Sequence, residues 1–195
     1  MVSEHSDAQD GETAALALKI LVAGGFGVGK TTFVTAVSEI DPLTTEAVMT
    51  AASQHLDDLS AVPDKTATTV AMDFGRISLA GDLILYLFGT PGQNRFWFMW
   101  DDLCRGAIGA VVLVDTRRLA DCFSAIDYFD DARLPYVIGV NAFHGRQPHA
   151  IDAVREALAV PGHVPVIPCD ARSRDSVKTV LIELVRHSMA KLAVA

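Results

Sequence analysis

The sequence predicts an α/β fold built on a mostly parallel sheet of about six strands, with one antiparallel edge pair and helices on both faces. Short apolar runs alternate with amphipathic segments from Leu16 to the end of the chain, as in proteins where each buried strand is followed by a helix. Residues 108–114 are apolar without interruption, which is typical of a central strand buried on both faces.

Apolar runs and turn residues together set the expected bounds of each element. Strands are expected at residues 16–23, 69–79, 83–88, 108–114, 136–140 and 164–168. Helices are expected at residues 30–39, 119–131, 148–159 and 174–192. Residues 41–68 break this rhythm, and a further helix is expected within them at residues 46–59. The sequence Ala80-Gly81-Asp82 is typical of a hairpin turn, so the strands on either side of it form the antiparallel pair.

Length and composition indicate one domain with a large buried core. The chain has 195 residues, of which 50% are hydrophobic and 21% charged, so a disordered chain is excluded. Residues 1–14 read as a flexible polar tail and residues 15–195 as a single domain. No apolar run approaches the roughly 18 to 20 residues of a membrane span. Signal-peptide and lipid-anchor patterns are absent, so we expect a cytoplasmic protein, with any membrane recruitment through partners.

Charge and cysteine content exclude two further classes of function. The net charge of −8 argues against a nucleic-acid binder, which depends on clustered Lys and Arg. Cys104, Cys122 and Cys169 are widely spaced and odd in number, which favours buried free thiols over disulfides or a zinc site.

The most informative motif is Gly24-Gly25-Phe26-Gly27-Val28-Gly29-Lys30-Thr31, which fits G-x-x-x-x-G-K-[ST] at every fixed position. It lies between an apolar strand and an amphipathic helix, the context in which such a loop wraps a triphosphate with its backbone amides. Lys30 is expected on the β- and γ-phosphates, and the Thr31 hydroxyl on Mg²⁺. The sequence therefore predicts a nucleoside triphosphate site in a three-layer P-loop NTPase fold.

Three later segments extend the motif into a family resemblance. They are Thr69-Val70-Ala71-Met72-Asp73-Phe74, Thr90-Pro91-Gly92-Gln93-Asn94-Arg95-Phe96 and the run from Arg105 to Asp115. Together they resemble the Ras-like small GTPases over roughly residues 16–190. Their details are most similar to the bacterial MglA-type polarity GTPases, and especially to the GTP-binding proteins of actinobacterial conservon operons.

The resemblance implies roles for individual residues. Gln93 would orient the attacking water, with Lys30 as its catalytic partner. Thr31 and Thr69 would hold Mg²⁺. Thr68 is the alternative to Thr69 as the first-switch threonine. The implied contacts to GTP or GDP involve Gly25, Phe26, Gly27, Val28, Gly29, Lys30, Thr31, Thr32, Gly92, Asn141, His144, Asp170, Ala171 and Arg172.

The sequence departs from the family pattern at the metal. Small GTPases usually carry an Asp that holds a Mg²⁺-bound water at the position of Gly89, a gap that MglA-type proteins share. Loss of such a carboxylate is expected to weaken the metal site. Asp73 on the neighbouring strand either compensates for this loss or is a carboxylate facing the edge of the sheet.

A second departure concerns the base. The usual N-K-x-D appears as Asn141-Ala142-Phe143-His144, so the Asp that accepts two guanine hydrogens is replaced by an imidazole with one acceptor nitrogen. Such a loss costs on the order of 1–3 kcal/mol of discrimination. The later S-A-K motif appears as Asp170-Ala171-Arg172, where the Ala171 N–H is expected to bond the base oxygen.

Hydrolysis and partner binding are both affected by bulky residues near the loop. Phe26 stands where Ras has glycine, and its ring is expected to slow hydrolysis by crowding the approach of a partner's arginine to the γ-phosphate. Within this chain, Lys65 or Arg95 would be the candidates to supply a positive charge there instead. Phe96, Trp97, Phe98 and Trp100 lie beside the second switch, either as a partner interface or as core residues.

Three functions stay open at this point. The first is a nucleotide-dependent switch that hydrolyses GTP slowly and, by resemblance, signals to a roadblock-domain (MglB-like) protein encoded with sensor-kinase-like proteins. The second is a module that holds a nucleotide with little turnover. The third is a P-loop kinase or ATPase.

Overall fold

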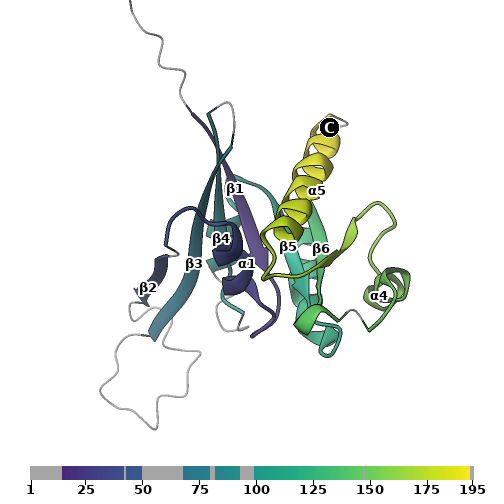
Figure 1. Ribbon diagram of the computed structural model, residues 1–195. Coiled ribbons are helices and arrows are strands. Elements are labelled where there is room, and N and C mark those ends of the chain that lie inside the picture. Colours follow the sequence, from purple (N-terminus) through teal and green to yellow (C-terminus); the bar gives the residue numbers. More distant parts are fainter. Residues whose placement is uncertain are drawn as a thin grey trace, which may run out of the picture.

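A single mixed sheet forms the centre of the molecule (Figure 1). The computed structural model describes residues 15–41, 43–49, 68–79, 82–92, 99–146 and 148–193. The strand order among these residues is β2-β3-β4-β1-β5-β6-β7. The strands are β1 (Leu16–Ala23), β2 (Leu43–Met49), β3 (Thr68–Leu79), β4 (Leu83–Gly89), β5 (Ala107–Val114), β6 (Tyr136–Asn141) and β7 (Val166–Cys169).

Helices connect and cover these strands. The described α-helices are α1 (Lys30–Val37), α2 (Trp100–Cys104), α3 (Phe123–Asp131), α4 (Ile151–Leu158) and α5 (Arg174–Leu192). Two short 3₁₀ segments, η3 (Leu119–Cys122) and η4 (Phe143–Gly145), precede α3 and follow β6. The four helices predicted from sequence therefore correspond to α1, η3 with α3, α4 and α5.

The sheet confirms the predicted class and adds one strand to it. β4, β1, β5, β6 and β7 run parallel, whereas β3 is antiparallel to both β2 and β4. The additional strand is β2, so the helix predicted at residues 46–59 is wrong for residues 46–49, and residues 50–59 lie outside the described part of the chain. β2 satisfies its backbone by pairing with β3, from Leu43 opposite Phe74 to Met49 opposite Thr68. Such long-range pairing overrides weak local helix propensity.

Two hydrophobic clusters lie on opposite faces of the sheet, and the alternation of residues along β1 separates them. Ile20 and Val22 belong to the cluster that α1 and α5 cover, while Leu21 and Ala23 belong to the cluster that α2, α3 and α4 cover. In Figure 1, α1 and α5 lie in front of the sheet. The chain therefore forms the three layers predicted from sequence.

This topology brings the predicted motifs to one edge of the sheet. The carboxyl ends of β1, β4, β5, β6 and β7 all lie at this edge because these strands are parallel. The phosphate loop follows β1, Thr90 follows β4, and Asp115 follows β5. In open parallel sheets this edge is where ligands bind.

The remaining sequence predictions concern thiols and the membrane. The three cysteines are free; Cys122 and Cys169 are buried, and burial raises the pKa of the Cys122 thiol to about 11 and that of Cys169 to about 12. Among the helices described here, none combines the length and apolar character needed to span a bilayer.

Candidate functional site

The phosphate loop, residues 24–29, turns sharply from β1 into α1. Gly29 immediately precedes α1 and has φ 105°, in the left-handed region that favours glycine. A Cβ atom at this position would lie 2.8 Å from the Asn141 side-chain nitrogen. Glycine is therefore required there by both backbone conformation and space.

Lys30 is the first residue of α1 and is buried against the loop. Its ammonium group donates hydrogen bonds to the carbonyl oxygens of Gly24 (2.9 Å) and Gly25 (2.8 Å). Burial lowers the pKa of Lys30 to about 8, while the nearby negative charge of Asp73 opposes this shift. Burial therefore destabilises the protonated form of Lys30 unless a further anion lies nearby, and a bound phosphate would supply that anion.

A cavity of about 550 Å³ opens above Lys30 at the carboxyl edge. It is lined by Phe26, Gly27, Gly29, Lys30, Thr31, Thr32, Asp73, Thr90, Pro91 and Gly92. The structure therefore brings phosphate-loop residues and Gly92, which the resemblance assigns to the second switch, to one cavity. Gly92 lies so close that a Cβ atom there would be 2.6 Å from Lys30 Nζ and 3.1 Å from the Phe26 backbone nitrogen.

Several residues that line this cavity, among them Thr31, Asp73 and Thr90, carry side-chain oxygen atoms. The Thr31 hydroxyl donates a hydrogen bond of 2.7 Å to Asp73 Oδ2. Thr90 is a further lining residue of the cavity, and its buried hydroxyl makes no hydrogen bond with the described residues. Asp73 is the β3 residue whose side chain contacts Thr31. The side chain of Thr69 lies outside the described part of the chain, so its role at Mg²⁺ stays a prediction.

Asn141 connects the phosphate loop to the loop after β7. Its side-chain nitrogen donates to the Val28 carbonyl (2.9 Å), and its side-chain oxygen accepts from the Ala171 backbone N–H (3.1 Å). All three residues are buried. The Ala171 N–H was predicted to bond a base oxygen; the structure instead engages it with Asn141. The reason is the side-by-side placement of β6 and β7, which spacing in the sequence does not reveal.

Two carboxylate–arginine pairs occupy the base side of the edge. Asp170 binds the Arg172 guanidinium at 3.0 Å through both oxygens, and this contact holds the pKa of Asp170 below its ordinary value. The buried Asp115 binds Arg117 through two oxygens, which likewise lowers its pKa. The Arg117 guanidinium also lies 4.0 Å from the centre of the Phe143 ring. The Asp115–Arg117–Phe143 arrangement was not predicted; a charged residue directly after a buried strand is the signal that could have found it.

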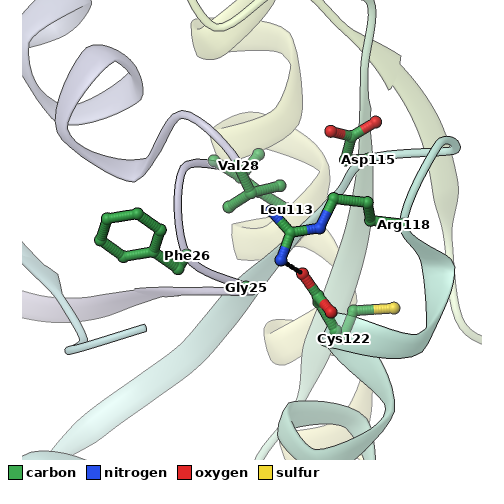
Figure 2. A pocket seen from close by; sticks show the side chains of 8 residues that line it. Gly25, Phe26, Val28, Leu113, Asp115, Arg118 and Cys122 are labelled. Atoms are coloured by element: carbon green, nitrogen blue, oxygen red, sulfur yellow. Dashed lines mark ion pairs between the residues drawn. The ribbon is translucent and has the colours of Figure 1, made fainter. Parts of the chain in front are cut away.

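Arg118 is a second cation that sequence reasoning missed. It forms an ion pair of 2.5 Å with Asp121, and Figure 2 shows its guanidinium beside Gly25 of the phosphate loop. A cavity of about 320 Å³, lined by Gly25, Phe26, Gly92, Arg118, Ala120, Asp121 and Ser124, continues from this point. Arg118 is therefore an arginine beside the phosphate loop, whereas the predicted candidates Lys65 and Arg95 lie outside the described residues.

The structure also decides part of the aromatic cluster. Trp100 is buried and packs on Phe129, with ring centres 5.4 Å apart, which agrees with the core alternative for this residue. The Trp100 indole lies in the core because α2 places it against Phe129 of α3. Phe26 is the opposite case, since 67% of it is exposed beside the cavity.

Several predicted residues lie outside what the structure describes. These are Lys65, Gln93, Arg95, Phe96, Trp97 and Phe98. His144 lies in η4, but its side chain is likewise outside the description.

Comparison with known proteins places this site in a family. The model of the ATP_bind_1 family, described as conserved hypothetical ATP binding proteins, matches residues 22–191. An uncharacterized protein of Methanocaldococcus jannaschii is 29% identical over 126 residues, which cover 64% of this chain and 69% of that protein.

Solved structures agree on the fold. The G domain of the T. maritima FeoB iron transporter has a TM-score of 0.61 at 14% identity, covering 88% of this chain and 99% of that one. The FeoB G-domain of Methanococcus jannaschii has a TM-score of 0.56 at 14% identity, covering 89% and 99%. The molecule therefore has the fold of a nucleotide-binding G domain. The chain belongs to the ATP_bind_1 family.

Proposed function

We propose that this protein is a nucleotide-dependent molecular switch that binds GTP and GDP with Mg²⁺ and hydrolyses GTP slowly. The observation that carries the proposal is the convergence of Lys30, Thr31 and Gly92 on one cavity at the carboxyl edge. Loop amides, a helix N-terminus and a buried ammonium together suit a triphosphate. Gly92 lies so near the Lys30 ammonium that a Cβ atom at position 92 would be 2.6 Å from it, so a γ-phosphate bound by Lys30 would bear on the start of the second switch.

The donor atoms suit Mg²⁺, which prefers hard oxygen ligands. The fit rests on the unpartnered Thr90 hydroxyl and on the Thr31–Asp73 contact, which leaves the Thr31 oxygen lone pairs free for a cation. When bound, Mg²⁺ would neutralise the charge of the β- and γ-phosphates. Thr31 would hold the ion, and Lys30 would stabilise the phosphate oxygens.

Slow hydrolysis follows from the groups around the γ-phosphate position. Gln93 would orient the water, as the family resemblance implies. The exposed Phe26 ring stands beside this position and would hinder an arginine supplied by a partner. The nearby Arg118 is engaged by Asp121, so it would supply little charge until that pair opens.

The partner we propose is a roadblock-domain protein associated with sensor-kinase-like proteins. Phe96, Trp97 and Phe98 would contribute to that interface together with the exposed Phe26, because aromatic residues are enriched where proteins meet. The net charge of −8 suits a protein partner better than a nucleic acid. Co-purification with such a partner in GTP, and not in GDP, tests this assignment.

Adenine binding is the second candidate, favoured by two observations. The family is described as ATP binding, and the Ala171 N–H is already engaged by Asn141. Against it, a neighbour by fold, the cytosolic domain of the T. maritima FeoB iron transporter, is described in a GDP form (TM-score 0.63, 14% identity). Chromatography of the nucleotide released from natively purified protein distinguishes the two. We expect GDP, and recovery of ADP with micromolar ATP affinity would overturn the guanine assignment.

Single-turnover hydrolysis of the bound triphosphate separates a switch from a module that only holds nucleotide. We expect slow phosphate release that accelerates with the partner. A flat signal in both conditions would establish the module instead.

A further inference from the structure

The oxygen-lined end of the phosphate cavity contains one carboxylate among its described lining residues, and it comes from β3. The strand that leads into this end, β4, ends at Gly89 and is followed by Thr90, so neither position supplies an acidic side chain. Because a divalent cation beside a triphosphate needs a carboxylate to orient its ligands, the source of that carboxylate matters.

Strand register explains how Asp73 reaches the site. Asp73 and Gly89 are directly opposed in the antiparallel pairing of β3 with β4. A Cβ atom at Gly89 would lie 3.0 Å from both Cβ and Oδ2 of Asp73, closer than nearly all real contacts. The missing side chain at Gly89 therefore provides the space that the Asp73 carboxylate occupies.

Asp73 also fixes the hydroxyl that faces the cation. Thr31 donates its only hydroxyl hydrogen to Asp73 Oδ2 at 2.7 Å. The lone pairs of the Thr31 oxygen are then available toward the cavity, where a cation can accept them. A residue without an acceptor at position 73 would leave the hydroxyl free to rotate, and a neutral acceptor would hold it without a negative charge.

The Thr90 hydroxyl gives a second, independent sign of a polar ligand at this end. Thr90 is 2% exposed, and its hydroxyl makes no hydrogen bond to any described residue. Buried hydroxyls are normally satisfied, so an unpartnered one on a residue that lines the cavity indicates a partner supplied by a ligand or its water.

We propose that Asp73 is the residue that positions the divalent cation of the bound nucleotide, acting through the Thr31 hydroxyl from the space that Gly89 leaves. This inference rests on the proposed function. Asp73 on β3 lies directly opposite Gly89, the position at the end of β4 where small GTPases usually carry this carboxylate. Asp73 is a positioning residue, because it contacts the Thr31 hydroxyl and not the phosphates.

Three variants test this assignment through nucleotide release. Asp73→Asn preserves shape and removes charge, and Asp73→Gly with Gly89→Asp returns the carboxylate to β4. Asp82→Asn is the matched control, since Asp82 is exposed and its φ of 59° suits Asn equally well. Release of a fluorescent GDP analogue is timed in Mg²⁺ and in EDTA, and Mn²⁺ binding to the GDP complex is followed by electron paramagnetic resonance.

We expect Mg²⁺ to slow release from wild type and Asp82→Asn equally. Asp73→Asn should weaken Mn²⁺ affinity about 10- to 100-fold and lose most of the Mg²⁺ effect, with release in EDTA unchanged. The double variant Asp73→Gly with Gly89→Asp, the exchanged pair, should regain the slowing of release by Mg²⁺. If Asp73→Asn keeps the wild-type Mg²⁺ effect, or the exchanged pair stays as weak as Asp73→Asn, the assignment to Asp73 is overturned and the proposed function survives. If wild type binds no nucleotide in either medium, both fail.

Discussion

The phosphate side and the base side of the sheet edge differ in how their polar groups are satisfied. On the phosphate side, the Thr90 hydroxyl has no partner among the described residues, and the buried Lys30 ammonium carries a pKa lowered to about 8. On the base side, Asn141, Asp170 and Asp115 are all engaged by other protein groups. The phosphate side thus holds buried polar groups that lack protein partners or are costly to keep charged, whereas the base side is held together by its own contacts.

This difference shows which part of a nucleotide the protein depends on. Phosphate binding uses backbone amides and one ammonium, which accept any nucleoside triphosphate. Base recognition needs free donors and acceptors with fixed geometry, and the described groups offer few of them. We therefore expect changes on the phosphate side to weaken nucleotide binding more than changes on the base side do.

The largest expected effect comes from Asn141, which joins the two sides. Asn141→Ala would leave the buried Val28 carbonyl and Ala171 N–H unsatisfied, which should lower the free energy of unfolding by about 2–4 kcal/mol. Urea unfolding measures this, with the exposed Thr179→Ala as a control that should change it little. A loss as small as that of the control would mean that Asn141 does not join the two loops.

Contact between the phosphate loop and η3 is the next most sensitive feature. A Cβ atom at Gly25 would lie 2.5 Å from Asp121 Cβ, so Gly25→Ala should cost about 1–3 kcal/mol of stability. Gly162→Ala is the matched control, because a Cβ atom there meets nothing within 4 Å. Equal melting temperatures for the two variants would show that η3 does not pack against the loop as described.

The pKa of Lys30 makes phosphate binding sensitive to pH. The ammonium is largely protonated below a pH of about 8 and loses its proton above it. If only the charged form binds, GTP affinity should fall by about tenfold per pH unit above this value. Titrations between pH 7.5 and 9.5 test this, with Lys30→Met expected to be independent of pH. Unchanged wild-type affinity across the range would separate Lys30 from phosphate binding.

The smallest effect is expected on the base side. Arg172 and Asp170 are partly exposed, so Arg172→Ala should cost at most about 1 kcal/mol of stability and little nucleotide affinity. Arg186→Ala, which breaks an exposed ion pair on α5, provides the comparison. A tenfold loss of affinity confined to Arg172→Ala would show that this guanidinium contacts the nucleotide.

Sequence reasoning succeeds where the signal is local. The phosphate loop is contiguous, and buried strands such as β5 are continuous apolar runs, so both could be placed from sequence. β2 could not, because its strand conformation depends on pairing with β3 rather than on its own residues. The contact between Thr31 and Asp73 joins residues 42 positions apart, and it depends on the register that opposes Asp73 to Gly89. The Asn141–Ala171 bond has the same origin in neighbouring strands.

The most direct test of a phosphate site at Lys30 is a calorimetric titration of wild type and Lys30→Ala with GTP and Mg²⁺. Loss of a buried, charge-assisted contact predicts affinity about 10- to 100-fold weaker in the variant. Lys178→Ala, on the exposed face of α5, should bind as wild type does. Wild-type affinity in a folded Lys30→Ala protein would contradict the account.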